Sequence, residues 1–391
     1  MIARAALAAM LALAAPALAA PKAKLAALPP YAGAYQPQTV DERGQWAEAD
    51  EDERQLRDSA AVVTDPALNA YVRRVLCNAV GDDRCASVRI YILRVPVFNA
   101  SMSANGTMRV YTGLLLRVRS EAELAAVLGH EFGHFEERHV LAGFRAARTA
   151  TDLTTWLTLA GGYAAVSTAA TSHTIAGNFY AYGRDQERAA DRLAFSYTAA
   201  SRYRPGAAAD VWTRVMDEND ATSLGRHQRS QRYDKVAFFA SHPAPLERTV
   251  TLRELARKDG DDGEDATDTY AAALATWRPQ FLTDQIKLND FGGTEYLLAQ
   301  LAKDGWTPDL LFARGELYRQ RGNPRDLVSA AGFYREAIAK GDADPLAQRG
   351  LGLALLRSGD AAAGRQALTD YLTLRPDCED AAMLRSLAAA Q

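Results

Sequence analysis

The chain has 391 residues, of which 48% are apolar and 24% are charged, and its 45 basic and 48 acidic residues give a formal net charge of −3. This apolar fraction with so little net charge excludes an intrinsically disordered chain, and the lack of excess positive charge argues against a nucleic-acid binder. Three cysteines are too few for a disulfide scaffold, and the length predicts two domains.

The first residues carry the pattern of a secretory signal peptide, predicted over residues 1–19. Arg4 supplies the positive charge, an uncharged apolar stretch follows, and Ala17-Leu18-Ala19 matches the small-residue cleavage pattern. The apolar stretch is shorter than the roughly 20 residues of a membrane-spanning helix, which favours cleavage over an uncleaved anchor. We therefore expect the mature chain to work outside the cytoplasm.

Two of the three cysteines lie close together in the sequence. Cys77 and Cys85 are separated by a Gly81-Asp82-Asp83 turn signal. In an oxidising compartment they can close a small loop as a disulfide, which leaves Cys378 over. The alternative is that both thiols remain unpaired.

Beyond the signal, the pattern predicts an extended lead-in and then helices around two short strands. Residues 20–45 are rich in Pro, Ala and Gln without periodicity, and helical spacing begins at Trp46. Asp65-Pro66 marks the start of a helix. The alternating, β-branched segments Val88–Leu93 and Arg109–Thr112 predict strands. The apolar face of the helix is formed by Leu68, Tyr71, Val72, Val75 and Leu76.

The middle of the chain predicts long helices. Ser120, with Glu123 three residues later, is a capping-type start for a helix that continues to about His139. Residues 152–180 are apolar, but they contain Gly161-Gly162 and scattered Thr and Ser. A membrane span is possible here, yet these interruptions favour a packed helical hairpin, because a span needs roughly 20 unbroken apolar residues.

An acidic, glycine-broken run divides the chain. Its Gly positions do not fit a calcium loop, so we interpret residues 259–270 as a solvated linker between two domains. The following segment, 271–391, is helical and repeats: Gly315-x-x-Tyr318 returns as Gly352-x-x-Leu355. The spacing is near the ~34-residue period of tetratricopeptide repeats. The alternative is an ordinary helical domain.

The chemistry is concentrated in one short motif, His130-Glu131-Phe132-Gly133-His134, which has the form H-E-x-x-H. Four residues turn a helix through about 400°, so His130 and His134 lie on one face and both can bind one metal ion. Glu131 lies beside that face, where it can accept a proton from the attacking water. The motif predicts a catalytic Zn²⁺ site, one per chain.

Catalytic zinc requires a third protein ligand, and Glu187 is the better candidate. His139 lies nine residues past His130, which on a continuous helix places it on the opposite face. Glu187 and Asp191 are four residues apart and share a helix face, so Glu187 can bind the metal while Asp191 orients a ligating histidine. The alternative is a solvated pair of carboxylates among arginines.

The order of these motifs resembles the zinc metallopeptidases that include the CAAX prenyl protease and HtpX. The similarity is most specific over residues 85–255, and it departs from the family at Ala189, where the family pattern E-x-E-A-D has a second Glu. The signal peptide and the C-terminal repeats resemble the periplasmic branch of that family. The matching segments are Phe98-Asn99-Ala100, Tyr111–Leu115, Glu123–His134, Glu187-x-x-x-Asp191, Ser241-His242-Pro243 and Arg248.

The resemblance implies a mainly α (α+β) architecture: a gluzincin-type metallopeptidase domain with a small sheet over residues 46–258, followed by tetratricopeptide-like helices over 271–391. It also implies that the segment around His242 folds over the metal site. His242 would then be a gate or an extra ligand, and Arg248 would stabilise the developing oxyanion.

The predicted function is a periplasmic zinc endopeptidase acting on misfolded or stalled outer-membrane polypeptides. The segment Phe98–Ala100 or the strand Arg109–Thr112 can pair with an extended substrate. The resemblance implies that the repeats bind the outer-membrane β-barrel assembly machinery. A chaperone or scaffold with a latent zinc site, or a membrane-embedded protease, are the alternatives.

Overall fold

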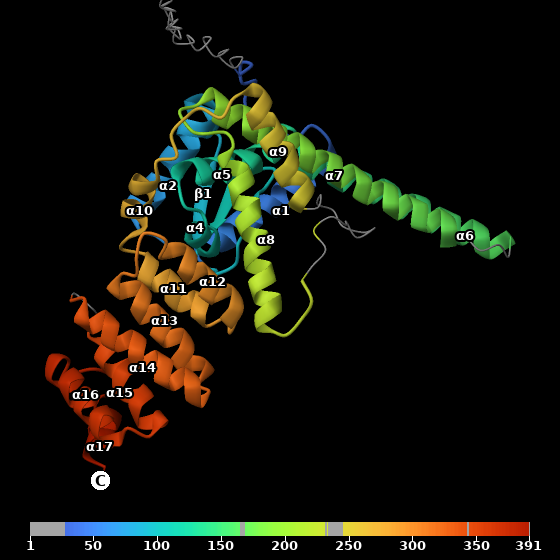
Figure 1. The fold of residues 1–391 in the computed structure, drawn as a ribbon. Coiled ribbons are helices and arrows are strands. Elements are labelled where there is room, and N and C mark those ends of the chain that lie inside the picture. Colours follow the sequence, from blue (N-terminus) through green and yellow to red (C-terminus); the bar gives the residue numbers. More distant parts are fainter. Residues whose placement is uncertain (1–27, 165–168, 231–232, 234–244, 342–343, 391) are drawn as a thin grey trace, which may run out of the picture.

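The computed structural model describes residues 28–164, 169–230, 233, 245–341 and 344–390. These residues are mainly helical with one small sheet, which confirms the predicted mainly α (α+β) class. Figure 1 shows a central body, a long helical hairpin that projects from one side, and a C-terminal stack of helices at one end. The predicted signal peptide, 1–19, lies outside the described residues.

The N-terminal arm leads into α1, Val40–Arg57. This helix begins within the predicted extended lead-in, because Thr39 and Glu42 form a capping box: Glu42 N–H donates to Thr39 Oγ1, and Thr39 N–H donates to Glu42 Oε2. The expectation that residues 20–45 are extended is therefore wrong for residues 40–45. Before the helix, Leu28 and Tyr31 pack against the main core.

Helix α2, Pro66–Val80, forms as predicted, with Asp65 as the N-cap and Pro66 as the first helical residue. All five residues of its predicted apolar face are buried. The short α3, Asp82–Cys85, follows at once, and the structure joins Cys77 to Cys85 in a disulfide with Cα atoms 5.0 Å apart.

The sheet has three strands: β1, Arg89–Leu93; β2, Ala100–Met102; and β3, Thr107–Tyr111. Their order is β1-β3-β2, with β1 parallel and β2 antiparallel to β3. Two strands are those predicted, although β3 ends one residue early because Thr112 begins α4, Thr112–Arg117. Since β3 is central, β2 forms one outer edge of the sheet.

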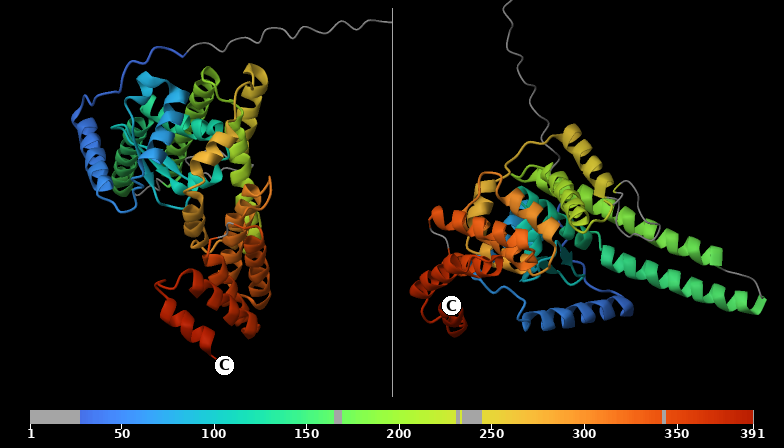
Figure 2. Two further views of the ribbon diagram at one scale, coloured as in Figure 1. Left: turned by 90° about the vertical axis from the view of Figure 1, so that its left-hand side faces the viewer. Right: turned by 60° about the horizontal axis from the view of Figure 1, so that its bottom comes forward.

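Helix α5, Glu121–Glu136, crosses the body and contacts α7, Ala169–Ala200. Helix α6, His139–Ala164, runs beside α7, and the right-hand view of Figure 2 shows the pair extending far from the body. The hairpin expected over 152–180 is thus part of two longer helices. None of the helices in the described parts of the chain is both long and apolar enough to span a membrane.

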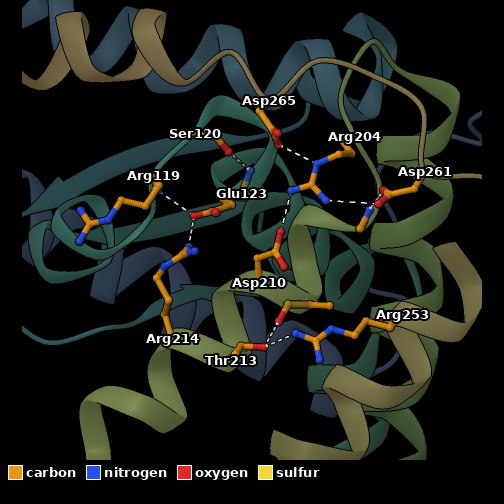
Figure 3. A network of polar contacts seen from close by, with 12 residues as sticks. Arg119, Ser120, Glu123, Arg204, Asp210, Thr213, Arg214, Arg253, Asp261 and Asp265 are labelled. Carbon is orange, nitrogen blue, oxygen red and sulfur yellow. Dashed lines mark hydrogen bonds and ion pairs between the residues drawn. The ribbon is translucent and has the colours of Figure 1, made fainter. Parts of the chain in front are cut away.

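Two further helices complete the body: α8, Ala207–Gly225, and α9, Pro245–Asp259. Of the predicted solvated linker, 259–270, residues 261–264 are exposed, but its last residues lie in the next helix, where Tyr270 is buried. The acidic run is also held by ion pairs. Arg204 donates to Asp261 and Asp265 of this run, and to Asp210 of α8 (Figure 3).

The remaining helices continue to the C-terminus: the first contacts α2 and α5, and each of the later ones packs against its neighbours in the sequence. The first of them share the core of the body, since Phe281, Leu298 and Leu310 belong to the same buried cluster as Val72 and Phe132. Their bounds are α10, Thr267–Leu274; α11, Arg278–Ile286; α12, Phe291–Leu301; α13, Pro308–Arg321; α14, Pro324–Ala339; α15, Leu346–Ser358; α16, Ala361–Leu374; and α17, Ala381–Ala389.

The last two full pairs repeat one packing device. A Cβ atom at Gly315 of α13 would lie 2.6 Å from the ring of Tyr334 on α14, and one at Gly352 of α15 would lie 2.6 Å from Leu368 on α16. In each pair, therefore, a glycine on the first helix makes room for a large residue on the second. Gly315 and Gly352 are the positions that the sequence repeat equates.

Candidate metal centre

The helix that carries the H-E-x-x-H motif is fixed at its start by a capping arrangement. Ser120 accepts a hydrogen bond from Glu123 N–H at 3.1 Å, and Glu123 Oε2 accepts one from Arg119 N–H at 2.7 Å. Arg214 of α8 forms an ion pair with the same Glu123 carboxylate (Figure 3). The predicted helix start is thus also a point where α5 and α8 are joined.

The two motif histidines face the same side of α5, as the helical spacing predicts. His130 Nε2 and His134 Nε2 lie 3.1 Å apart, and the two rings are nearly perpendicular. His130 is buried, whereas His134 is partly exposed in a groove. Their Nε2 atoms therefore point at one common position.

Glu187 reaches this position because α7 approaches α5 very closely. A Cβ atom at Gly133 would lie 3.4 Å from the Cα and O atoms of Ala190, which is fully buried. The close crossing places the Glu187 carboxylate 3.4 Å from His130 Nε2 and 3.4 Å from His134 Nε2. One donor atom from each of the three residues lies within 4.8 Å of the others.

Behind these side chains lies a buried ion pair. Asp191 Oδ1 is 2.9 Å from His130 Nδ1, and Arg248 Nε of α9 donates to Asp191 Oδ2 at 2.8 Å. Burial alone would raise the pKa of Asp191, but the hydrogen bonds and charges of His130 and Arg248 outweigh it and lower the pKa to about 2. Asp191 is thus held as a carboxylate that accepts from His130.

The acidic neighbours also act on His130 itself. Burial and the positive charge of Arg248 would lower its pKa, but hydrogen bonds to Asp191 and Glu187 outweigh both and raise the pKa to about 9. The carboxylates of Asp191 and Glu187 therefore stabilise positive charge at His130.

Glu131 lies one residue along the helix, and it lines the same groove. Burial raises the pKa of its carboxyl above the ordinary range, although the charges of His130 and His134 oppose this. A carboxylate with a raised pKa is a better proton acceptor near neutral pH than an exposed one.

His139 does not lie on the opposite face from the motif, and the helical-wheel argument placed it wrongly. Helix α5 ends at Glu136, and Arg138 has φ 57°, so the chain turns before His139 begins α6. His139 Nδ1 lies 3.0 Å from His134 Nδ1, on the side of that ring away from His130. Burial and the neighbouring His134 lower the pKa of His139 to about 4.

The donor atoms open into a groove of about 680 Å³. The outer strand β2 lines it, together with Phe98 and Asn99 before that strand, and Trp212 of α8. Phe98 and Trp212 pack edge to face at 6.0 Å, and the Arg248 guanidinium lies 3.8 Å above the Trp212 ring. The wall of the groove beside His130, His134 and Glu187 is therefore aromatic.

The sequence also predicted His242 and Arg248 at the site, and the structure describes only Arg248. His242 lies outside the described residues. Arg248 is buried, with its guanidinium between Asp191, the Trp212 ring and the Glu187 carboxylate, from which Nη1 lies 3.8 Å. These contacts describe a residue that holds Asp191, and the predicted action of Arg248 on an oxyanion remains a prediction.

The chemistry of the three donor residues, His130, His134 and Glu187, matches that of a zinc site. Two imidazole nitrogens and one carboxylate are the protein ligands of a large class of catalytic zinc sites, which leave a position open for water or substrate. Each imidazole has a partner for its other nitrogen, as metal-binding histidines usually do. The residues therefore fit Zn²⁺, with His130, His134 and Glu187 as its ligands.

Comparison with known proteins shows similarity to metallopeptidases, in agreement with the donor residues of the site. The model of peptidase family M48 matches residues 63–256. A protein named as a beta-barrel assembly-enhancing protease in Vibrio cholerae is 28% identical over 294 residues, which cover 64% of this chain and 58% of that protein. The Escherichia coli metalloprotease LoiP is 26% identical over 53% of this chain and 78% of its own length. The beta-barrel assembly-enhancing protease of Escherichia coli is 23% identical, and the chain spans only 42% of it.

Proposed function

We propose that this chain, whose residues 63–256 form a metallopeptidase domain of family M48, is a periplasmic zinc endopeptidase that acts on misfolded or stalled outer-membrane proteins. The observation that carries the proposal is the convergence of His130, His134 and Glu187 beside Glu131, in a groove bordered by an outer strand. The periplasmic location rests on the predicted signal peptide.

Zn²⁺ held by these three residues would supply a Lewis acid that activates water and polarises the scissile carbonyl. Glu131 accepts the proton from the attacking water and then transfers it to the leaving amine nitrogen. Asp191 keeps His130 in the orientation that this chemistry requires, and the packing of α5 on α7 brings both histidines to Glu187.

The sheet supports one of the two predicted modes of substrate binding. The strand at Arg109–Thr112 is excluded, because β3 is central and pairs on both sides. On either side of β2, Asn99 O accepts from Tyr111 N–H and Ser103 N–H donates to Thr107 O. The alternation of an antiparallel pair therefore turns the backbone groups of Ala100 and Met102 outward. These two residues can pair with an extended substrate that lies in the groove.

Backbone pairing of this kind recognises an unfolded segment and is largely independent of its sequence. The aromatic wall of Phe98 and Trp212 then favours a large apolar side chain of the substrate next to the cleavage point. Strands of outer-membrane barrels alternate apolar and polar residues, so that unfolded forms of them offer both features.

The assembly function is supported by the names of two relatives and by the C-terminal helices. Both relatives are named for enhancing β-barrel assembly, although this chain spans 58% and 42% of them. The paired helices α13–α14 and α15–α16 repeat one glycine-based packing device, as tetratricopeptide-like repeats would. We propose that these repeats bind the β-barrel assembly machinery.

The decisive experiment compares wild-type protein with Glu131→Gln on an unfolded outer-membrane protein. Glu131→Gln keeps the shape of the side chain and removes the proton acceptor, so we expect zinc content and folding to be unchanged and cleavage to fall about 10²- to 10⁴-fold. Full cleavage by Glu131→Gln would contradict the mechanism. No cleavage by either protein, with zinc bound in both, would favour the scaffold alternative.

A further inference from the structure

The corner between α5 and α6 places a third imidazole against the metal ligands. Arg138 adopts a left-handed conformation, with φ 57°, which interrupts the helix between the end of α5 at Glu136 and the start of α6 at His139. His139, the first residue of α6, therefore lies with its ring edge to face against His134, at 4.9 Å between ring centroids. The contact joins the two Nδ1 atoms, 3.0 Å apart.

This contact restricts where the protons lie, because a hydrogen bond between two neutral imidazole nitrogens needs one proton between them. The Nε2 atom of His134 faces His130 and Glu187 and must present a lone pair to a metal ion. The proton of His134 is then on Nδ1, where it can be donated to His139. His139 accepts with an unprotonated Nδ1 and carries its own proton on Nε2.

The arrangement parallels the one around His130, with one chemical difference. His130 Nδ1 lies 2.9 Å from the carboxylate of Asp191, whereas His134 Nδ1 faces an imidazole. Acceptors of this kind fix the tautomer and the ring orientation of metal-binding histidines. The acceptor for His130 is thus the negatively charged carboxylate of Asp191. The acceptor for His134 is the imidazole of His139, which has no formal charge in its neutral form.

We propose that His139 is a positioning residue that accepts a hydrogen bond from His134 Nδ1–H and thereby keeps His134 Nε2 free to bind the metal. The proposal rests on the proposed zinc site. Spacing from the motif alone would place His139 on the opposite face of a continuous helix, but α5 ends at Glu136, before His139.

His139 is itself held in place from two sides. Gln186 Nε2, next to the ligand Glu187 on α7, donates to the His139 carbonyl oxygen at 3.3 Å. The neighbouring Arg138 guanidinium lies 4.3 Å above the ring of Tyr35 in the N-terminal arm. The corner is therefore tied both to the helix that supplies the third ligand and to the arm that precedes α1.

The test replaces His139 in the full mature chain and measures zinc affinity by competition with a chelator. His139→Phe keeps a ring and removes the acceptor, so we expect zinc affinity to fall about 10- to 100-fold. His139→Asn places an oxygen acceptor near the position of Nδ1, and we expect its zinc affinity to return to within about threefold of wild type. His227→Asn, at an exposed histidine away from the groove, is the matched control and should bind zinc as wild type does.

A second measurement does not depend on any variant. Nitrogen-15 NMR of the zinc-loaded wild type should show His134 protonated at Nδ1 and His139 protonated at Nε2 only. A proton on Nδ1 of His139, or equal zinc affinity in His139→Phe and wild type, would overturn the proposal. Wild-type protein that binds no zinc would instead contradict the proposed function itself.

Discussion

The α5–α7 crossing and the α13–α14 pair both depend on a glycine, but they use it in opposite ways. At the first, Gly133 faces the small Ala190, and the two backbones come close enough for ligands from both helices to meet. At the second, Gly315 faces the large Tyr334, whose buried ring fills the space that a side chain would otherwise occupy. A glycine can therefore either bring polar groups of two helices together or make room for a large apolar side chain.

The largest effect should come from enlarging Gly133. A methyl group just fits at 3.4 Å from Ala190, so Gly133→Ala should keep zinc affinity and slightly favour the helix. The branched side chain of Gly133→Val must push α7 away, which separates Glu187 from the histidines. We expect zinc affinity to fall by about 100-fold or more in Gly133→Val, measured by chelator competition, because one of three ligands is displaced. Similar affinity in the two variants would show that close contact here is not required.

A matched substitution in the C-terminal helices should affect stability and leave the metal site intact. In Gly315→Val the new side chain overlaps the Tyr334 ring, and overpacking of this kind typically costs about 1–3 kcal/mol. We expect a lower midpoint of denaturant unfolding, with zinc affinity unchanged. Combining it with Tyr334→Leu should recover part of the loss. A loss of zinc binding in Gly315→Val would mean that the two crossings are coupled.

The smallest effect concerns a contact between the central body and the C-terminal helices. Arg94, just after β1, forms an ion pair with Asp284 of α11, with Arg94 Nη2 2.9 Å from Asp284 Oδ1. Burial would raise the pKa of Asp284, but the hydrogen bond and charge of Arg94 outweigh it and lower the pKa. A lowered pKa in the folded state means that the pair stabilises the fold above about pH 4 and is lost as the pH falls below that value.

Asp284→Asn should therefore lower stability modestly at pH 7 and reduce the dependence of stability on pH below about pH 4. Denaturant unfolding at several pH values measures both effects. An unchanged acid dependence in Asp284→Asn would show that this ion pair does not contribute to the stability of the fold.

Local patterns in the sequence predicted most of the elements and the ligands. The spacing of His130 and His134 fixes their common face on any helix, and Glu187 with Asp191 shares a face for the same reason. Asp65-Pro66 and Ser120 mark helix starts through bonds to nearby backbone groups. Thr39 and Glu42 form the same kind of signal, and the prediction of an extended segment up to residue 45 overlooked it.

What the sequence alone determined is local: the positions of caps, the faces of helices and the kind of chemistry that H-E-x-x-H supports. The tertiary structure decided which distant groups meet. The third ligand reaches the motif only because Gly133 and Ala190 let α7 approach α5. His139 meets His134 only because Arg138 interrupts the helix, and a helical wheel assumes that no such turn occurs. Residue spacing has a fixed geometric meaning within one helix, but contacts between helices depend on packing across the whole core.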